Sequence, residues 1–532
     1  MRLKKIKLIY SFITITGRIF QIIVPVVFLL LSACATVRYD QPREDSYAMP
    51  ISNDTKLAQE ISSLIAEHAN LSGFFPLLEG IDAFATRIGM ARLAEKSIDV
   101  QYYIWRGDMT GVALAAELLQ AADRGVRVRM LLDDLQISEH DLALRALDSH
   151  PFIEVRMFNP TSQRRFKGFE MLTRFSLLNR RMHNKCYIAD NLLAVVGGRN
   201  IGDEYFNANS EVDFSDFDVL AVGPVVPEIS RTFDAYWNSQ LAVPINFLYR
   251  NEELDQNALT QLRQDLLGYT NKIQHSVYAQ VILTSETVQQ LRQKKAKFYW
   301  GDAHAVADTP EKFLADIKDD STHLGPQLNY LVDSLDSEVL IISPYFVPGD
   351  ALVSKLAALV KRGISVVIIT NSLASNDVGI VHAAYAKYRQ PLLQAGVKLY
   401  EFKASSTVAK KVKSIIPGSS RASLHAKVFI FNRQNLFVGS MNLDPRSAVL
   451  NSEFGVVIKS PEMASDLAQG VIENLPSFTY RLFLDGEEGD QQLRWESITD
   501  GHTKIYTSEP NASIWRKMSA WFMAFFVPEY LL

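Results

Sequence analysis

Two stretches of the chain repeat one pattern of hydrophobic and polar positions. In each, an apolar run of strand length precedes an Ala- and Leu-rich run of helical length, and Arg-Gly then leads into a second apolar run. The first copy covers 97–132 and the second covers 339–370. Gly125 and Gly363, which end the helical runs, lie 363 − 125 = 238 residues apart. The recurrence predicts an internal duplication, in which each copy is an α/β unit with buried strands and helices on the sheet faces.

A histidine and a lysine, two positions apart, follow later in each copy, and an asparagine comes after them. The sets are His183, Lys185 and Asn200, and His425, Lys427 and Asn442. The asparagine lies 17 residues after the histidine in both (200 − 183 and 442 − 425), just beyond Gly-Gly or Gly-Ser. Because residues i and i+2 of a strand share a face, each histidine projects with its lysine into one space. A tight glycine turn then returns the asparagine to the same place.

These side chains suit chemistry at a phosphodiester. Neutral imidazole can attack phosphorus and protonated imidazole can act as a general acid, whereas lysine and asparagine can bind the phosphate oxygens. A nucleophilic histidine also needs an acceptor on its second ring nitrogen. Asp216 and Glu453, each between Ser and Phe, occupy matching places and are the candidate acceptors. If the two copies face each other, the two histidines, two lysines and two asparagines surround one phosphate, and we expect these six and the two carboxylates to be catalytic.

The motifs resemble those of the phospholipase D superfamily. The strings GGRNIGDEYF at 197–206 and NLDPRS at 442–447 are similar to its bacterial type C cardiolipin synthase branch and to phospholipase D-like lipoproteins. The resemblance covers most of 60–532. It implies two duplicated α/β/α lobes packed face to face, with the active site at their interface. It also implies no metal or other cofactor, a phosphohistidine on His183 and protonation of the leaving group by His425.

The seventh residue after the motif histidine differs between the copies. It is Asp190 in the first and Asn432 in the second, whereas the family pattern has aspartate at both places. Because the position lies on the opposite strand face from the histidine, we expect it to support the motif and not to touch substrate. Activity is therefore expected to survive Asn432; an inactive second half is the alternative.

The N-terminus has the composition of an export signal. Basic residues precede an apolar run at 19–33, which is short for a membrane span, and a small-residue sequence then ends at Cys34. We expect 1–33 to be a lipoprotein-type signal peptide, Cys34 to be lipidated and 34–60 to be a tether. An uncleaved N-terminal anchor is the alternative. Either way the body is exported, and we expect it to be lipid-anchored on the periplasmic side of a bacterial membrane, inner or outer.

The remaining chain divides by its patterns into four parts. They are a first lobe at 61–245, a connecting segment at 246–320, a second lobe at 321–480 and a tail at 481–532. The connecting segment contains a polar, Gln-rich helical stretch that we expect to bridge the lobes. The tail looks irregular before an apolar stretch at 514–527, for which burial in the core is favoured over contact with a membrane interface.

Basic residues gather just before each motif histidine and predict a positive rim for anionic lipid headgroups. They are Arg164, Arg165, Lys167, Arg174, Arg180 and Arg181 in the first copy, and Lys403, Lys410, Lys411, Lys413 and Arg421 in the second. Phenylalanines among the first group suit insertion between acyl chains. These are Phe166, Phe169 and Phe175.

The charge balance bears on the class of substrate. With 55 basic and 59 acidic residues the net charge is −4, so binding to nucleic acid is not expected. The predicted function is a membrane phosphatidyltransferase that makes cardiolipin from phosphatidylglycerol and a second phospholipid such as phosphatidylethanolamine. Hydrolysis of phospholipids to phosphatidic acid is the alternative, and a nuclease or a non-catalytic lipid-binding protein is less favoured. The donor lipid, any accessory protein and the oligomeric state stay open.

Overall fold

The computed structural model describes the folded body of the chain. The described residues are Tyr39 and 43–523, apart from 69, 136–139, 162–163, 165–173, 209–211, 250–251, 405–420, 488 and 500. Several residues of the sequence predictions lie outside them, namely the signal peptide with Cys34, Arg165, Phe166, Lys167, Phe169, Lys410, Lys411, Lys413 and the side chain of Arg421. Within the described part, no helix has the length and apolar character needed to cross a bilayer.

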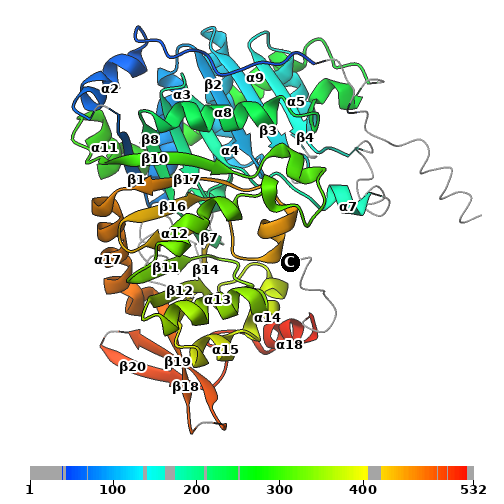
Figure 1. Cartoon of the computed structure of the whole chain (residues 1–532). Helices are drawn as coiled ribbons and strands as arrows, with labels where there is room; N and C mark the ends of the chain where they lie inside the picture. Colours follow the sequence, from blue (N-terminus) through cyan, green and yellow to red (C-terminus); the bar gives the residue numbers. More distant parts are fainter. Residues whose placement is uncertain are drawn as a thin grey trace, which may run out of the picture.

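The duplication is visible as two lobes (Figure 1), and the strands of each lobe pair in the same order. In the first lobe the order is β1 (Ser72–Leu77), β8 (Asp218–Val222), β6 (Leu193–Gly197), β5 (Cys186–Ala189), β2 (Ser97–Tyr102), β3 (Arg127–Asp133), β4 (Ile153–Phe158) and β9 (Ala242–Pro244). In the second it is β10 (Tyr299–Ala307), β17 (Phe454–Lys459), β16 (Asn435–Gly439), β15 (Val428–Phe431), β11 (Glu338–Ile342), β12 (Ser365–Asn371), β13 (Lys398–Phe402) and β18 (Thr479–Asp485).

Helices cover both faces of each sheet, because the buried strands have apolar residues on both of their faces. In β3, Val128 belongs to the core on one face and Leu131 to the core on the other. The outer face of the first sheet carries α3 (Gly80–Leu93), α4 (Met109–Asp123) and α5 (Asp141–Asp148), and its inner face carries α8 (Val225–Trp237). In the second lobe the outer helices are α12 (Asn329–Asp333), α13 (Gly349–Lys361), α14 (Gly379–Ala386) and α15 (Arg389–Gln394), and the inner helix is α17 (Pro461–Phe478).

The lobes are joined by a shared core and by paired edge strands. One buried cluster contains residues of α8 and of α17 together, so the inner layers of the two lobes form a single core. The equivalent edge strands β1 and β10 pair antiparallel, with Ser72 opposite Gly301 and Phe74 opposite Tyr299. The structure thus confirms two α/β/α lobes packed face to face.

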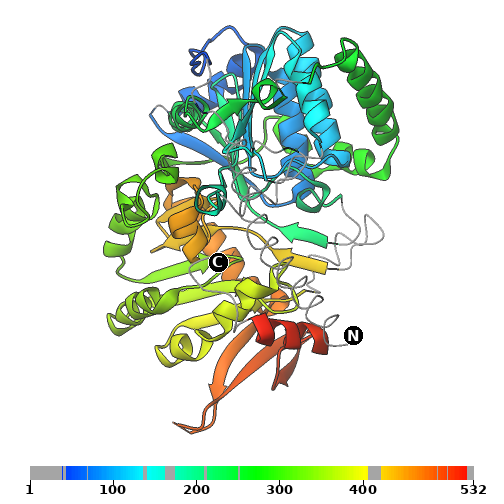
Figure 2. The same cartoon turned by 90° about the vertical axis from the view of Figure 1, so that its right-hand side faces the viewer.

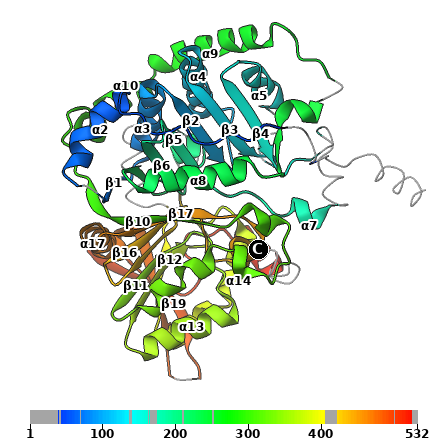
Figure 3. The same cartoon turned by 45° about the horizontal axis from the view of Figure 1, so that its top comes forward.

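Two segments differ from the sequence expectation. The helices α9 (Ala258–Gln274), α10 (Val277–Thr284) and α11 (Glu286–Arg292) pack on the first lobe, where α9 lies along α4 and α5, and it is β10 that joins the lobes (Figure 3). In the tail, β18 is followed by the antiparallel strands β19 (Gln492–Thr499) and β20 (His502–Tyr506), which extend the second sheet. The described part of the tail ends in α18 (Ile514–Met523), where Trp515 is 79% exposed and not buried in the core.

Two further helices and two further strands lie in the described part, besides several single turns of helix. They are α2 (Lys56–Ala66), α7 (Phe175–Leu178), β7 (Val212–Ser215) and β14 (Arg421–Leu424). The last two form a separate two-stranded sheet.

Candidate active site

His425 is held at the interface between the lobes by the small sheet. β14 leads directly into His425 and runs parallel to β7 of the other lobe, and the two strands lie side by side between the lobes (Figure 2). The His425 backbone N–H donates to the carbonyl of Ser215 at 2.7 Å. Ser215 immediately precedes Asp216, so this pairing brings a carboxylate of the first lobe to the histidine of the second.

The mirror arrangement holds His183. Met182 forms a parallel bridge with Ser452, and the His183 backbone N–H donates to the Ser452 carbonyl at 3.0 Å. Ser452 immediately precedes Glu453. Each motif histidine is therefore fixed by its backbone to the residue before the other lobe's carboxylate.

The carboxylates cross over between the lobes. His183 Nδ1 lies 2.9 Å from Glu453 Oε2, and His425 Nδ1 lies 2.5 Å from Asp216 Oδ2. A carboxylate on Nδ1 favours the tautomer with its proton there and leaves Nε2 available for chemistry. The sequence identified both carboxylates as the acceptors but left open which histidine each one serves.

The His183 pair favours a neutral imidazole. Burial lowers the pKa of His183 well below its ordinary 6.5, and the charges of Lys185 and Lys427 lower this pKa further. Burial also raises the pKa of Glu453 to about 7, against the opposing effect of Lys185. Because an unprotonated imidazole is the nucleophilic form, His183 is in the state that can attack phosphorus.

The His425 pair has a different balance of charge. Burial would raise the pKa of Asp216, but the charge of His425 and its hydrogen bond, together with the charges of Lys427 and Arg199, hold this pKa below its ordinary 3.8. Burial and the charge of Lys427 lower the pKa of His425, and Asp216 offsets them only in part, so this pKa also lies below its ordinary 6.5. An ionised carboxylate on Nδ1 stabilises imidazolium, so His425 is the better placed of the two to gain and give a proton. The rings of Tyr205 and Phe214 enclose it, with centroids 5.3 and 5.1 Å from the imidazole.

Both motif lysines are fully enclosed. Each ammonium donates to the carbonyl of its own histidine, Lys185 to His183 and Lys427 to His425. Burial lowers the pKa of Lys185 to about 7 and that of Lys427 to about 8. A bound phosphodiester supplies the negative charge that keeps them protonated, so lysine charge and substrate binding reinforce each other.

The two motif asparagines differ in their hydrogen bonds. The Oδ1 of Asn200 accepts from the Ile104 N–H at 3.2 Å and its Nδ2 donates to the Tyr205 hydroxyl at 3.0 Å. Asn442 is buried, and its Oδ1 has no hydrogen-bond partner among the described residues. Phosphate binding by both remains a prediction.

The second residue of the Gly-Gly or Gly-Ser pair lies next to the carboxylate of its own lobe, and its size suits that carboxylate. A Cβ on Gly198 would lie 2.2 Å from Asp216 Oδ1, so only glycine leaves room for this carboxylate. The equivalent position in the second copy, 242 residues later (440 − 198), is Ser440, whose hydroxyl donates to Glu453. Ser447 donates to the other Glu453 oxygen at 2.7 Å.

Asp190 and Asn432 perform the same structural task. Asp190 accepts the backbone N–H groups of Glu95, Lys96 and Ser97 at the start of β2. Asn432 Oδ1 accepts those of Asp336 and Ser337 at the start of β11. Both residues have positive φ, 51° and 52°, which Asn and Asp tolerate best among non-glycine residues. The amide thus replaces the aspartate of the family pattern because an acceptor oxygen is what the position requires.

Two positioning residues were missed from the sequence. Asp133 ends β3 and accepts the N–H of Met182 at 2.9 Å, and Asn371 ends β12 and accepts the N–H of Leu424 at 3.0 Å. Each therefore fixes the residue just before a motif histidine. Their spacing of 371 − 133 = 238 equals that of the two helix-ending glycines, which is the signal that could have identified them.

The predicted basic rim is wrong for three of its described members. Arg164 and Arg181 are buried in ion pairs with aspartates of the first lobe, and Lys403 is buried with its ammonium on backbone carbonyls. Arg180 also donates to backbone carbonyls. Sequence alone could not locate these partners, because they come from other strands and loops. Phe175 is 46% exposed, as insertion between acyl chains would require.

A cluster of metal-binding side chains would indicate metal-assisted chemistry at the phosphate. Over the described ranges, no three or more His, Cys, Asp and Glu side chains are arranged to hold a metal ion. Cys186 is a buried free cysteine.

Comparison with known proteins decides the family. The sequence model for "Cardiolipin synthase, PLD-like domain" matches 87–237 and 331–473, which together exceed half of the chain and include both histidine motifs. The chain belongs to this phospholipase D-like family. Its two matched segments coincide with the two lobes, so the internal duplication is a pair of phospholipase D-like halves.

Individual relatives agree with this assignment. Cardiolipin synthase C of Escherichia coli (strain K12) is 39% identical over 483 residues, which cover 90% of this chain and 100% of that protein. The major cardiolipin synthase ClsA of Bacillus subtilis (strain 168) is 25% identical over 441 residues, or 81% of this chain and 73% of that protein. Among solved structures, phosphatidylserine synthase of Haemophilus influenzae Rd KW20 is similar in fold, with a TM-score of 0.51 at 14% identity, covering 80% of this chain and 92% of that one.

Proposed function

We propose that this chain is a phosphatidyltransferase that makes cardiolipin from phosphatidylglycerol and a second phospholipid through a phosphohistidine. The observation that carries the proposal is its 39% identity to a cardiolipin synthase over the full length of that protein. The crossed histidine–carboxylate pairs support it, because they supply one neutral imidazole and one that can be protonated at the same interface.

In the first step, Nε2 of His183 attacks the phosphorus of the donor lipid. A P–N bond forms and the bond from phosphorus to the headgroup oxygen breaks. Nε2 of His425 gives its proton to that oxygen, so glycerol leaves from phosphatidylglycerol, or ethanolamine from phosphatidylethanolamine. The ammonium groups of Lys185 and Lys427 bind the non-bridging oxygens as negative charge builds up on them.

In the second step, a headgroup hydroxyl of another phosphatidylglycerol attacks the phosphatidyl-His183. His425, now neutral, takes the proton from this hydroxyl, the P–N bond breaks and cardiolipin is released. With water in place of the hydroxyl the product is phosphatidic acid. Exclusion of water favours transfer, and the histidines are only 8% and 5% exposed.

The products made by the purified full chain test this proposal. It is assayed in mixed micelles of phosphatidylglycerol with and without phosphatidylethanolamine, with His183→Ala as the matched control. Cardiolipin is expected from the wild type and none from the variant. Phosphatidic acid as the only product would show that the chain is a hydrolase and not a transferase. Lipid binding without any product would indicate a non-catalytic protein.

The proposal includes export and lipidation of Cys34. The apolar run at 19–33 followed by a cysteine supports both, and a lipid anchor would hold the site next to its substrate. Cells expressing the chain are labelled with radioactive palmitate. The wild type and Cys186→Ser are expected to take up label and Cys34→Ser to lose it. Equal labelling of Cys34→Ser would overturn this part of the proposal.

A further inference from the structure

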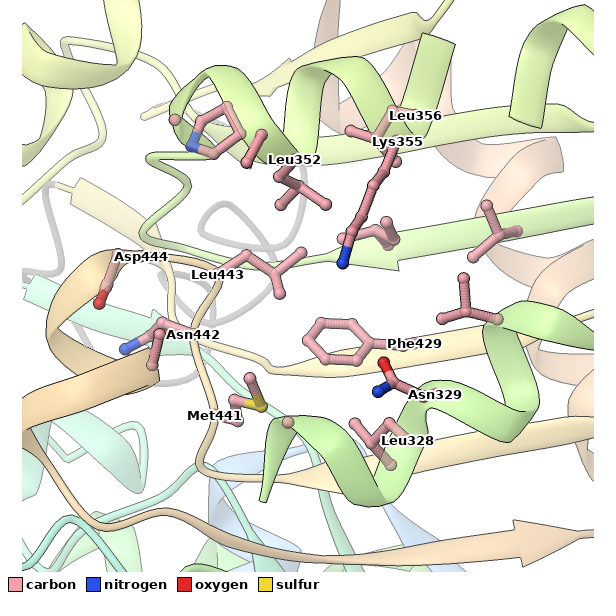
Figure 4. Close-up of a pocket in the computed structure, with 18 of the residues that line it drawn as sticks. Leu328, Asn329, Leu352, Lys355, Leu356, Phe429, Met441, Asn442, Leu443 and Asp444 are labelled. Carbon is pink, nitrogen blue, oxygen red and sulfur yellow. The ribbon is translucent and has the colours of Figure 1, made fainter. Parts of the chain in front are cut away.

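An apolar cavity of about 520 Å³ lies in the outer layer of the second lobe (Figure 4). This volume falls within the range of small-molecule pockets, about 300–1,000 Å³. Its walls come from the sheet, from α13 and from the short turn of helix η6 (Gly325–Leu328) that leads into α12. Apolar side chains dominate the lining, among them Leu328, Val332, Leu352, Leu356, Phe429 and Leu443.

One end of the cavity reaches the candidate active site. Asn442 and Asp444 line that end, as Figure 4 shows, and Asn442 is one of the predicted catalytic residues. Its buried Oδ1 has no hydrogen-bond partner among the described residues. The buried carboxyl group of Asp444 has a pKa raised to about 7, and in its ionised form it raises the pKa of Lys427.

The equivalent positions of the first lobe are more closely covered. Leu443 and Ile201 are equivalent, 443 − 201 = 242 residues apart, and each forms a bridge to the segment after the corresponding strand. Ile201 is completely buried, whereas Leu443 is only half-buried beside the cavity. The equivalent helices α4 and α13 differ in the same way. Helix α4 is covered by α9, whereas Leu352 on α13 is partly exposed.

We propose that this cavity holds one acyl chain of the phospholipid whose phosphate lies between His183 and His425, an inference that rests on the proposed function. A chain is the occupant that fits, because a phospholipid at the site has apolar tails next to its phosphate and the cavity offers an apolar lining next to Asn442. Lys355 extends its side chain over the cavity (Figure 4), and its methylene stem adds to the apolar surface.

Substrates of different chain length test the proposal. Leu352→Trp narrows the cavity from its partly exposed wall, and Ala358→Trp places the same side chain at an exposed position of α13 outside the lining. With long-chain phosphatidylglycerol, Leu352→Trp is expected to lower kcat/KM about tenfold or more, the loss from about 1.4 kcal/mol of binding. With dihexanoyl phosphatidylglycerol it is expected to stay within about twofold, since short chains fill little of the cavity. Ala358→Trp is expected to change neither.

An equal loss with both lipids would overturn the proposal, because it would mean damaged packing. No loss with either would mean that the cavity is not used.

Photolabelling gives a second readout that needs neither a variant nor turnover. Phosphatidylglycerol with a diazirine at the end of one acyl chain is irradiated with the wild-type chain, and labelled peptides are identified by mass spectrometry. Label is expected on the peptides that contain Leu352 or Phe429. Label only elsewhere would overturn the acyl-chain site even if cardiolipin is made, whereas label here without any product would sink the proposed function and leave the site standing.

Discussion

The two halves of the candidate site differ in the carboxylate that serves each histidine. His183 contacts Glu453, whose pKa is raised to about 7 by burial, and His425 contacts Asp216, whose pKa is held below its ordinary value. The first pair therefore tends toward neutrality, whereas Asp216 in the second stays ionised and stabilises the imidazolium form of His425 when that ring takes up a proton. An internal duplication supplies two similar half-sites, and different surroundings of the two carboxylates favour a nucleophile on one side and an acid on the other.

The two histidine substitutions test this division most strongly. His183→Ala is expected to abolish turnover, because no nucleophile is left. His425→Ala is expected to lower it by about 10²–10⁴-fold, the usual share of a general acid. With a donor whose leaving group needs no protonation, phosphatidyl label should accumulate on the His425→Ala protein. The label should be acid-labile and base-stable, and its location on any residue other than His183 would reverse the assignment.

The carboxylates should differ in the size of their effects. Asp216→Asn removes a negative charge from His425 and is expected to lower kcat by about 10–100-fold, as loss of a supporting carboxylate does. Glu453→Gln resembles the protonated glutamate and should cost only a few-fold. Steady-state kinetics with circular dichroism as a check on folding measures both. Equal losses would contradict the charge difference between the pairs.

The pH dependence of kcat/KM reports the free enzyme. Because the pKa of His183 is lowered, His183 stays neutral as the pH falls through 6.5, and no loss of activity is expected there. Lys185 and Lys427 have pKa values of about 7 and about 8, so their charges, and with them phosphate binding, disappear as the pH rises through this range. We expect kcat/KM to fall as the pH rises above about 7, where Lys185 loses its charge, and to fall more steeply above about 8, where Lys427 does. A profile still rising from pH 7 to 9 would rule out this titration.

The smallest expected effect is at Asn432. Asn432→Asp keeps the acceptor oxygen and should change activity and Tm little, whereas Asn432→Ala loses its backbone hydrogen bonds, each worth about 0.5–1.5 kcal/mol. It also places alanine at positive φ, so Tm is expected to fall by several degrees, at about 2–4 °C per kcal/mol. Asp190→Ala is the matched variant in the first lobe. A loss of activity in Asn432→Asp without a change in Tm would mean that the position acts on substrate.

Local pattern was enough to predict the duplication and the lobes. The alternation of strand-like and helical runs and the constant spacing of His, Gly and Asn are local features that recur, so they identified two α/β halves and the HxK strands. They also identified Asp216 and Glu453 by position. What they could not give was the crossing of these carboxylates, because it depends on backbone pairing between Ser215 and His425, 425 − 215 = 210 residues apart.

The errors have the same physical origin. Arg164 and Arg181 look like surface charges in the sequence because their aspartate partners are distant in the chain. The polar helices after residue 250 suggested a linker, yet they pack on the first lobe and cover α4. The strands β19 and β20 have too few buried residues to produce the alternation of apolar and polar positions that predicts a strand. Tertiary partners decide these cases, and a single sequence does not contain them.

The pairing of β1 with β10 has a consequence for how the protein must be assembled. Until β10 and the inner layer of the second lobe have been synthesised, the first lobe has an open strand edge and an uncovered apolar face, both of which invite wrong association. During synthesis, the N-terminal half is therefore exposed to solvent without the partner surfaces that complete its fold. Chaperoning should matter most in that interval, and an isolated half-chain should be recovered as aggregate or paired with a copy of itself.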